Sequence, residues 1–203
     1  MATFDERAKD WDTPEHIERS VAVANAIAAA IPLGRSMRVI EIGAGTGLLG
    51  LQLADRIGSL LLTDPSAGML EVADEKIRRA GLGQVATRRY ELVTDPPPAG
   101  GFDLLLSQLM LHHVKDTAAA LAAVHDLLVP GGQLALADLD AEDGTFHDAE
   151  AEGIHHHGFE RDRLASIVAA AGLTGIAFAT ATSIERDGRD YPLFLLTARR
   201  PRD

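Results

Sequence analysis

The 203-residue chain contains no cysteine, few aromatic residues (4%), and fewer basic than acidic residues. Without cysteine, disulfide bonds, thiolate zinc sites, iron–sulfur clusters and a cysteine nucleophile are excluded. The 19 Lys and Arg against 30 Asp and Glu give a formal net charge of −11, and such a field repels a phosphate backbone. The composition therefore predicts no nucleic-acid partner.

Long hydrophobic runs are also missing. The most apolar stretch, residues 21–33, contains Asn25 and Pro32 and is too short to span a bilayer. The N-terminus is acidic and lacks the apolar region that is typical of a signal peptide. We therefore expect a cytoplasmic protein with no membrane partner. A hydrophobic content of 46% with 24% charged residues favours one compact folded domain.

Helix and strand patterns alternate along the chain. Apolar residues at spacings of three and four predict a first helix that opens near Thr13 and stops at Pro32. Short apolar runs predict strands over residues 39–42, 60–63, 85–92, 102–106 and 134–137. Helices are expected between them and after them, over residues 48–56, 66–80, 117–128 and 161–171. This alternation indicates an α/β fold with a mostly parallel sheet and helices on both faces.

The last part of the chain has a different pattern. Two predicted strands, residues 175–183 and 193–198, are separated by a polar turn that contains Asp187 and Gly188. An Asp-Gly pair between two strands is a strong hairpin signal. We therefore expect a C-terminal antiparallel hairpin at the end of the sheet.

A glycine-rich turn, Glu41-Ile42-Gly43-Ala44-Gly45-Thr46-Gly47, lies between the first predicted strand and the helix after it. Glycine lets the backbone turn tightly and lets a ligand approach the main chain, and a helix N-terminus offers unpaired N–H groups. In open α/β sheets, ligands bind at the carboxyl ends of the strands. A bound ligand therefore explains the three glycines better than a bare turn does.

Two ligand classes compete for this turn. Gly45-x-Gly47-x-x-Gly50 matches the dinucleotide pattern, and Asp64 follows Gly45 by 19 residues, close to the roughly 20 expected for a ribose partner. Glu41, however, would repel a pyrophosphate and can pair with a cationic ammonium group. The chain also has no Tyr-x-x-x-Lys pair. A cationic ligand therefore fits better than NAD.

Several short motifs occur together: the glycine turn after Glu41, Asp64 with Ser66-x-x-Met69-Leu70, Phe102-Asp103, Leu111-His112-His113, and Leu128-x-Pro130-Gly131-Gly132. In this combination, over roughly residues 4–201, the chain resembles the class I S-adenosylmethionine-dependent methyltransferases. The resemblance implies a Rossmann-like sheet of seven strands, with the seventh strand antiparallel and inserted between the fifth and the sixth. It also implies one methyltransferase domain over residues 1–203, in which an N-terminal helical segment, residues 1–33, can cover the cofactor site.

The resemblance further implies S-adenosylmethionine as the cofactor. The backbone of Gly43, Ala44, Gly45 and Gly47 would then cradle the methionine part, with Glu41 facing its ammonium group. Asp64 would accept both ribose hydroxyls, and a helix cap is the alternative role for this residue. Further cofactor contacts are expected from Pro65, Met69, Glu91, Leu92 and Ser107. Asp95 is the alternative to Glu91 for the adenine amino group.

His112 and His113 follow the fourth predicted strand, at the edge of the sheet where members of this family place the substrate. One of them is a candidate catalytic base, and a packed histidine at the start of a helix is the alternative. Methyl transfer from a sulfonium is an in-line displacement, so alignment alone can supply much of the acceleration. Ser107-Gln108-Leu109-Met110 stands where methyltransferases of base or amide nitrogens carry Asn/Asp-Pro-Pro-Tyr.

We therefore expect an enzyme that methylates a small-molecule hydroxyl, amine or carbon. A protein side-chain methyltransferase, a non-catalytic nucleotide-binding regulator or scaffold of the same fold, and a short NAD-binding protein are the alternatives.

Histidines and acids cluster in the loop before the last predicted helix. His147 and His155-His156-His157 lie near Asp148, Glu150 and Glu152, and imidazole and carboxylate are common metal ligands. Three consecutive histidines cannot easily converge on one ion. The sequence therefore predicts no metal site here, and a loop that can instead line the substrate mouth.

Overall fold

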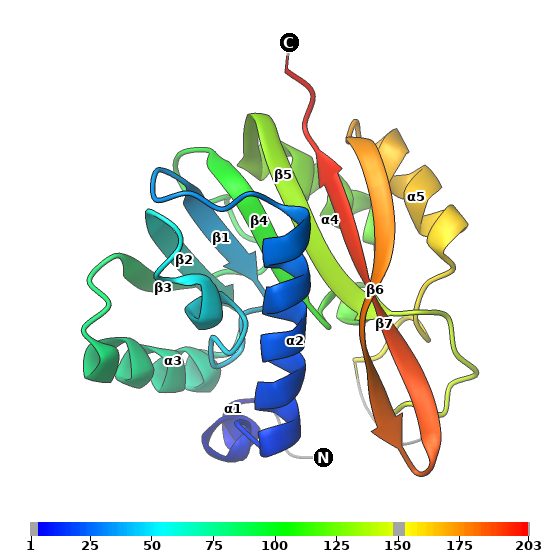
Figure 1. The fold of residues 1–203 in the computed structure, drawn as a ribbon, viewed down its shortest axis with the longest axis horizontal. Coiled ribbons are helices and arrows are strands. Elements are labelled where there is room, and N and C mark those ends of the chain that lie inside the picture. The colour runs from blue at the N-terminus through cyan, green and yellow to red at the C-terminus, as the bar shows by residue number, and fades with distance from the viewer. Residues whose placement is uncertain (1–3, 148–152, 203) are drawn as a thin grey trace.

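The computed structural model describes residues 4–147 and 153–202. Within these residues, seven strands form one sheet in the order β3-β2-β1-β4-β5-β7-β6 (Figure 1). The strands are β1 (Arg38–Ile42), β2 (Ser59–Asp64), β3 (Val85–Arg89), β4 (Phe102–Gln108), β5 (Leu128–Leu139), β6 (Thr174–Arg186) and β7 (Arg189–Arg199). Strands β1 to β5 pair in parallel, and β7 pairs antiparallel with both β5 and β6. The predicted Rossmann-like sheet, with its inserted seventh strand and its terminal hairpin, is confirmed.

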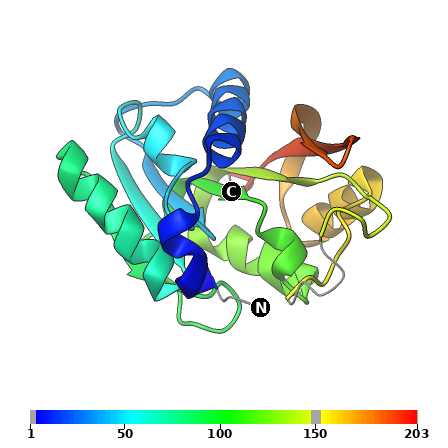
Figure 2. The ribbon, with the colours of Figure 1, turned by 90° about the horizontal axis from the view of Figure 1, so that it is seen from below.

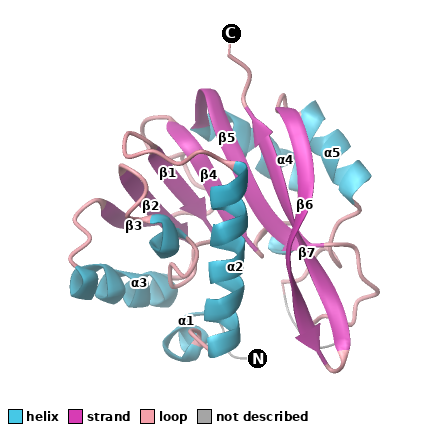
Figure 3. Cartoon of the chain, viewed as in Figure 1, coloured by secondary structure: helices cyan, strands magenta, loops and turns pink. Residues whose placement is uncertain are grey.

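Helices cover both faces of this sheet (Figures 2 and 3). They are α1 (Phe4–Arg7), α2 (Pro14–Ala30), α3 (Ala67–Ala80), α4 (Thr117–Leu127) and α5 (Arg161–Ala170), with short 3-10 helices η1 (Ala8–Asp10), η2 (Gly50–Leu53) and η3 (Leu111–His113). Helices α2 and α3 pack with η2 on one face, and α4 and α5 pack on the other. No helix of the described chain is both long and apolar enough to cross a membrane.

Side-chain caps begin three of the helices where the sequence predicts them. The hydroxyls of Thr13 and Ser66 accept hydrogen bonds from backbone N–H groups at the start of α2 and α3, and the Asp116 carboxylate does the same for α4. Gly81 ends α3 in the left-handed conformation, with φ of 64°. Such caps satisfy the N–H and C=O groups that a helix end leaves unpaired.

The helix expected over residues 48–56 is wrong. Only Gly50–Leu53 is helical there, as the 3-10 helix η2. The backbone N–H of Gly50 donates to the Glu41 carboxylate at 2.9 Å, and a Cβ on Gly50 would lie 2.4 Å from Glu41 Oε2. The Glu41 carboxylate therefore fixes the position of the Gly50 backbone at the start of this segment.

The sequence predicts that the third strand extends to Leu92. In the structure, β3 already ends at Arg89. The backbone N–H of Tyr90 still donates to the Asp64 carbonyl at 3.2 Å, and Glu91 then begins a turn that Thr94 and Asp95 close by donating to its carbonyl. The carboxyl ends of β1, β2, β4 and β5 share one edge of the sheet, so their following loops meet there.

Candidate active site

The glycine turn after β1 is held in a conformation that favours glycine. Gly43, Gly45 and Gly47 have φ angles of 67°, 54° and 80°, a region that residues with a Cβ rarely adopt. A Cβ on Gly43 would also lie 2.4 Å from the Met110 side chain. Glycine is therefore required at Gly43, where the turn approaches the segment after β4 closely.

Two buried carboxylates flank the turn. Glu41 is only 2% exposed, and burial raises its pKa to about 8. Asp64 Oδ2 accepts a hydrogen bond from the Gly45 backbone N–H and Oδ1 accepts one from Ser66, both at 2.8 Å. Burial raises the pKa of Asp64 as well. The pair therefore favours a ligand with positive charge or hydroxyl donors over an anionic one.

Both acids line a cavity of about 340 Å³ at the carboxyl edge of the sheet. It brings together most of the residues predicted from the sequence: Glu41, Gly43, Ala44, Gly45, Asp64, Pro65, Met69, His112 and His113. This volume lies within the range of small-molecule sites, about 300–1,000 Å³.

Four predicted residues lie outside the cavity lining. Gly47 packs against the Leu62 side chain, and Ser107 is buried with its hydroxyl donating to the Ile42 carbonyl at 3.0 Å. Glu91 is exposed, while Leu92 belongs to the hydrophobic core. The Asp95 carboxylate, the alternative to Glu91, accepts the Glu91 backbone N–H at 2.9 Å. The cofactor roles of these residues stay predictions.

The N-terminal segment forms one wall of the cavity, through Phe4, Arg7, Trp11, His16 and Ser20. The Phe4 and Trp11 rings meet edge to face at 5.8 Å, and the Arg7 guanidinium lies over both rings. This wall faces the glycine turn, because a Cβ on Gly45 would lie 3.8 Å from the Trp11 indole nitrogen.

His112 is fixed by a buried acid at the end of β5. Its Nδ1 lies 2.7 Å from Asp138 Oδ1, and its backbone N–H donates to Oδ2 at 3.2 Å. The two residues are 1% and 0% exposed. Among the described residues, His112 Nε2 is buried and has no hydrogen-bond partner. With Nδ1–H donating to the carboxylate, Nε2 keeps a lone pair that accepts no hydrogen bond, on a residue that lines the cavity.

Two further histidines surround this ring. The ring centroids of His113 and His147 lie 4.2 Å and 5.1 Å from that of His112. Burial lowers the pKa of His113, and it lowers that of His147 to about 4. Both rings are therefore neutral at neutral pH, and only His112 has a buried carboxylate beside it.

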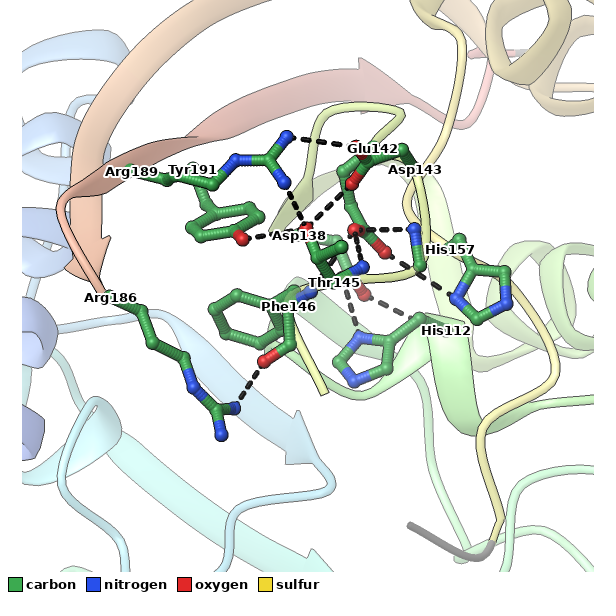
Figure 4. Close-up of polar contacts among 11 residues, drawn as sticks. His112, Asp138, Glu142, Asp143, Thr145, Phe146, His157, Arg186, Arg189 and Tyr191 are labelled. Carbon is green, nitrogen blue, oxygen red and sulfur yellow. Dashed lines mark hydrogen bonds and ion pairs between the residues drawn. The ribbon is translucent and has the colours of Figure 1, made fainter. Parts of the chain in front are cut away.

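The loop after β5 is clamped to the β6–β7 hairpin (Figure 4). Inside the loop, Glu142 Oε2 accepts three backbone N–H groups, those of residues 144, 145 and 146. From the hairpin, Arg186 donates to the Phe146 carbonyl, and Arg189 donates to Asp143 and Thr145. The clamp brings Phe146, His147 and Arg186 to the cavity wall.

Sequence reasoning missed Asp138, Gln108 and Arg186 as parts of this site. Asp138 had one usable signal, since an acid that directly follows an apolar strand of a parallel sheet lies at the ligand-binding edge. Arg186 had no such signal, because it lies on β6, which is the outermost strand of the sheet and pairs only with β7.

The histidine loop offers no metal site over residues 4–147 and 153–202, where no three His, Asp or Glu side chains converge suitably. Asp148, Glu150 and Glu152 lie outside the described residues. The absence of a metal therefore stays a prediction. His147 does line the cavity, as expected of a loop at the substrate mouth.

Several known proteins with a similar sequence are methyltransferases. A family model described as a methyltransferase domain matches residues 39–132. An uncharacterized methyltransferase of Mycobacterium bovis is 35% identical over 108 residues, which are 53% of each protein. A malonyl-[acyl-carrier protein] O-methyltransferase of Geobacter sulfurreducens is 30% identical over 178 residues, 80% of this chain and 65% of that protein. The chain spans about half the length of the first of these curated relatives.

A similar solved structure is that of phosphoethanolamine N-methyltransferase 2 from Haemonchus contortus, in complex with S-adenosyl-L-methionine. The TM-score is 0.75 at 15% identity, over 100% of this chain and 61% of that one. At this identity the likeness shows the fold alone.

Proposed function

This chain belongs to the family of class I S-adenosylmethionine-dependent methyltransferases, and from this premise we propose that it binds S-adenosylmethionine and methylates a small-molecule hydroxyl. One observation carries the proposal: a single cavity contains the glycine turn with its two buried acids on one side and an acid-backed histidine on the other. The domain extends over residues 1–203, with the N-terminal segment as its cover.

The residues around the glycine turn fit this cofactor. Glu41 supplies the negative charge that an ammonium group needs, and in pairing with it the acid gives up its proton. Each Asp64 oxygen accepts one backbone N–H group and keeps lone pairs for ribose hydroxyls. Gly43, Ala44 and Gly45 line the cavity and border the space for the methionine chain, and Pro65 and Met69 offer apolar surface to the adenine.

When bound, S-adenosylmethionine supplies an electrophilic methyl group. Phe4 and Trp11 exclude water from the cavity by covering it, which strengthens the electrostatic interactions inside. His112 Nε2 accepts the hydroxyl proton as the acceptor oxygen attacks, and Asp138 stabilises the imidazolium that results. The acid-backed His112 favours a hydroxyl acceptor, which must lose its proton as the methyl arrives, over an acceptor that needs no base.

Calorimetric titration tests the cofactor. We expect micromolar binding of S-adenosylmethionine and S-adenosylhomocysteine and no binding of NAD. Asp64→Ala is expected to weaken cofactor binding by roughly 10- to 100-fold, because hydrogen bonds to a charged group contribute about 1.5–3 kcal/mol each and water replaces part of the loss. Asp55→Ala removes an exposed acid outside the cavity lining; it is the matched control and leaves the affinity unchanged.

Two results would change the assignment. Tight NAD binding without the other two ligands contradicts the methyltransferase function. Unchanged affinity with a lower melting temperature in Asp64→Ala shows that this carboxylate serves the start of α3 and not the ribose.

A further inference from the structure

We propose that the N-terminal wall of the cavity binds the carboxylate of the cofactor, with the Arg7 guanidinium as the cation and the Trp11 indole N–H as a second donor. The inference rests on the proposed function and adds the residues that recognise the amino-acid end of S-adenosylmethionine. It makes Arg7 a specificity residue, which distinguishes the intact cofactor from a derivative that has lost its carboxylate.

The acids beside the glycine turn suit only part of the cofactor. S-adenosylmethionine carries an ammonium and a carboxylate group on the same carbon atom. Glu41 and Asp64 suit the ammonium group and the ribose hydroxyls, but they repel a carboxylate. Because the two groups of the amino acid lie so close together, the residues that bind the carboxylate have to border the glycine turn on another side.

Trp11 brings the N-terminal wall to this place. A Cβ on Gly45 would lie 3.8 Å from the Trp11 indole nitrogen. The ring of His16 packs 4.9 Å from the Trp11 ring, and His16 Nδ1 lies 2.6 Å from the Trp11 carbonyl oxygen. Within residues 4–147 and 153–202, the indole N–H donates to no acceptor. This donor is therefore available to a ligand oxygen beside Gly45.

The Arg7 guanidinium lies next to this donor. It is 5.0 Å from the centroid of the Trp11 ring and 5.8 Å from that of Phe4. It forms no ion pair and no hydrogen bond with any other described residue, since the carboxylates of Asp5 and Asp12 are directed to α3 and the glycine turn. Contact with the two rings leaves the planar fork of N–H donors without an acceptor, and this fork matches a carboxylate.

The other basic side chains of the cavity are less suited to this role. Arg186 lies at the loop after β5, where it pairs with Asp187 and donates to the Phe146 carbonyl. Burial lowers the pKa of His16, so its ring is neutral at neutral pH. Arg7 is therefore the charged group that the N-terminal wall offers to an anion beside the glycine turn.

Two ligands that differ in the carboxylate alone test this inference. S-adenosylhomocysteine and its decarboxylated form share the adenosine, the thioether and the amine. Calorimetry measures the affinity of each ligand at the same pH and ionic strength. We expect the wild-type protein to bind the decarboxylated form roughly 10- to 100-fold more weakly, because charge-assisted hydrogen bonds to the carboxylate are lost.

Arg7→Gln is the informative variant, and Lys9→Gln is its matched control. Both remove one positive charge from the N-terminal segment, but Lys9 is exposed and lies outside the cavity lining. Arg7→Gln is expected to weaken the binding of S-adenosylhomocysteine by roughly tenfold or more and to leave that of the decarboxylated form within about threefold. Lys9→Gln leaves both affinities within about threefold.

Two milder variants separate the two donors. Trp11→Phe keeps a ring beside Arg7 and removes the N–H, and it is expected to weaken only S-adenosylhomocysteine, by roughly three- to tenfold. Arg7→Lys keeps the charge without the fork and is expected to weaken the same ligand by a smaller factor than Arg7→Gln does.

The inference is overturned if the wild-type protein binds both ligands equally. It is also overturned if Arg7→Gln weakens both ligands by the same factor, since Arg7 then only holds the cover in place. If Arg7→Gln does not fold, the milder variants decide, and wild-type discrimination between the ligands in both of them overturns the inference. Failure of S-adenosylhomocysteine itself to bind the wild-type protein contradicts the proposed function, so the two failures are distinguished.

Discussion

His112 differs from the other cavity histidines in the group that faces its Nδ1. A buried carboxylate holds its ring at 2.7 Å, whereas His113 Nδ1 faces the Gly153 carbonyl at 2.9 Å. Both partners fix a ring orientation, but a charged carboxylate stabilises a protonated ring more strongly than a neutral carbonyl does. The sequence could not rank these two adjacent histidines. Under the proposed function they have different roles, with His112 as the base and His113 as part of the wall.

Replacing His112 by Gln is expected to lower kcat by about 10²–10⁴-fold, the usual contribution of a positioned base. The affinity for S-adenosylmethionine should change little, because His112 lies on the acceptor side. Initial rates of S-adenosylhomocysteine formation, with any acceptor that the wild-type protein methylates, measure the effect. His113→Gln is the control, with an expected loss under about tenfold. A loss under about tenfold in both variants means that alignment, and not proton removal by His112, limits the rate. A steep loss in both, with lower stability, means that the two histidines have packing roles.

The sequence indicates where His112 lies but not its partner. Position after β4 places it at the ligand-binding edge, and this follows from the order of strands alone. The pairing with Asp138 joins residues 26 positions apart, and it depends on how η3 turns back over the end of β5. Leu109 makes that turn with a φ of 51°, a conformation that no local pattern at a leucine predicts.

The N-terminal segment is attached to two neighbouring elements by aspartates. Asp5 Oδ1 accepts hydrogen bonds from the Ser66 hydroxyl and the Gly68 backbone N–H at the start of α3. Asp12 accepts one from the Thr46 hydroxyl at 2.5 Å in the glycine turn and pairs with Lys76 of α3. The cover of the cavity is thereby linked to the elements that form the cofactor side.

Asp12→Asn is expected to speed the dissociation of S-adenosylhomocysteine by roughly three- to tenfold, because the half-buried ion pair with Lys76 contributes on the order of 1 kcal/mol. Stopped-flow fluorescence of Trp11, the single tryptophan, follows the release. Glu75→Gln is the control, since it removes the exposed Glu75–Arg79 pair on the same helix. A dissociation rate that both variants leave unchanged shows that this contact does not hold the cover closed.

The sequence next to a helix predicts those boundaries that a capping residue forms. Where a helix boundary depends on a tertiary contact, the local sequence does not predict it. The starts of α2, α3 and α4 and the end of α3 follow from a side chain or a glycine next to the element itself. Residues 48–56 have a helical pattern, yet the Glu41 carboxylate binds the Gly50 N–H and leaves only a 3-10 turn. A contact between residues nine positions apart overrides the local preference there.

The whole sheet contributes to the ionisation of Glu41, because β1 lies between β2 and β4 with both faces covered by helices. Water is excluded from its carboxyl group, and the neutral form is favoured in the protein without ligand. This burial is a property of the assembled fold, and the sequence alone shows only an acid before a glycine. Burial of Glu41 beside the glycine turn therefore lowers the free energy of unfolding at neutral pH, because an unfolded chain would ionise this carboxyl group freely.

Stability should therefore fall as the pH rises. The pKa of Glu41 is about 8 in the folded protein and about 4.3 in an unfolded chain, so the folded state holds the proton more tightly. Its contribution is fully present below about pH 4.3 and is lost as the pH rises through 8, by roughly 1.4 kcal/mol per pH unit. Urea unfolding at pH 5.5, 6.5 and 7.5 measures this against Glu41→Gln, which cannot ionise.

The difference in unfolding free energy between the two proteins reports on Glu41 and on its electrostatic interaction with Asp64, because titrating groups that do not interact with Glu41, such as His147, contribute equally to both. We expect the wild-type protein to lose stability relative to Glu41→Gln across this range. Saturating S-adenosylmethionine should flatten the difference, since an ammonium group beside Glu41 favours the ionised carboxylate already at low pH. Parallel curves for the two proteins without ligand would show that Glu41 is ionised in the folded chain, and that the cofactor finds its negative charge already in place.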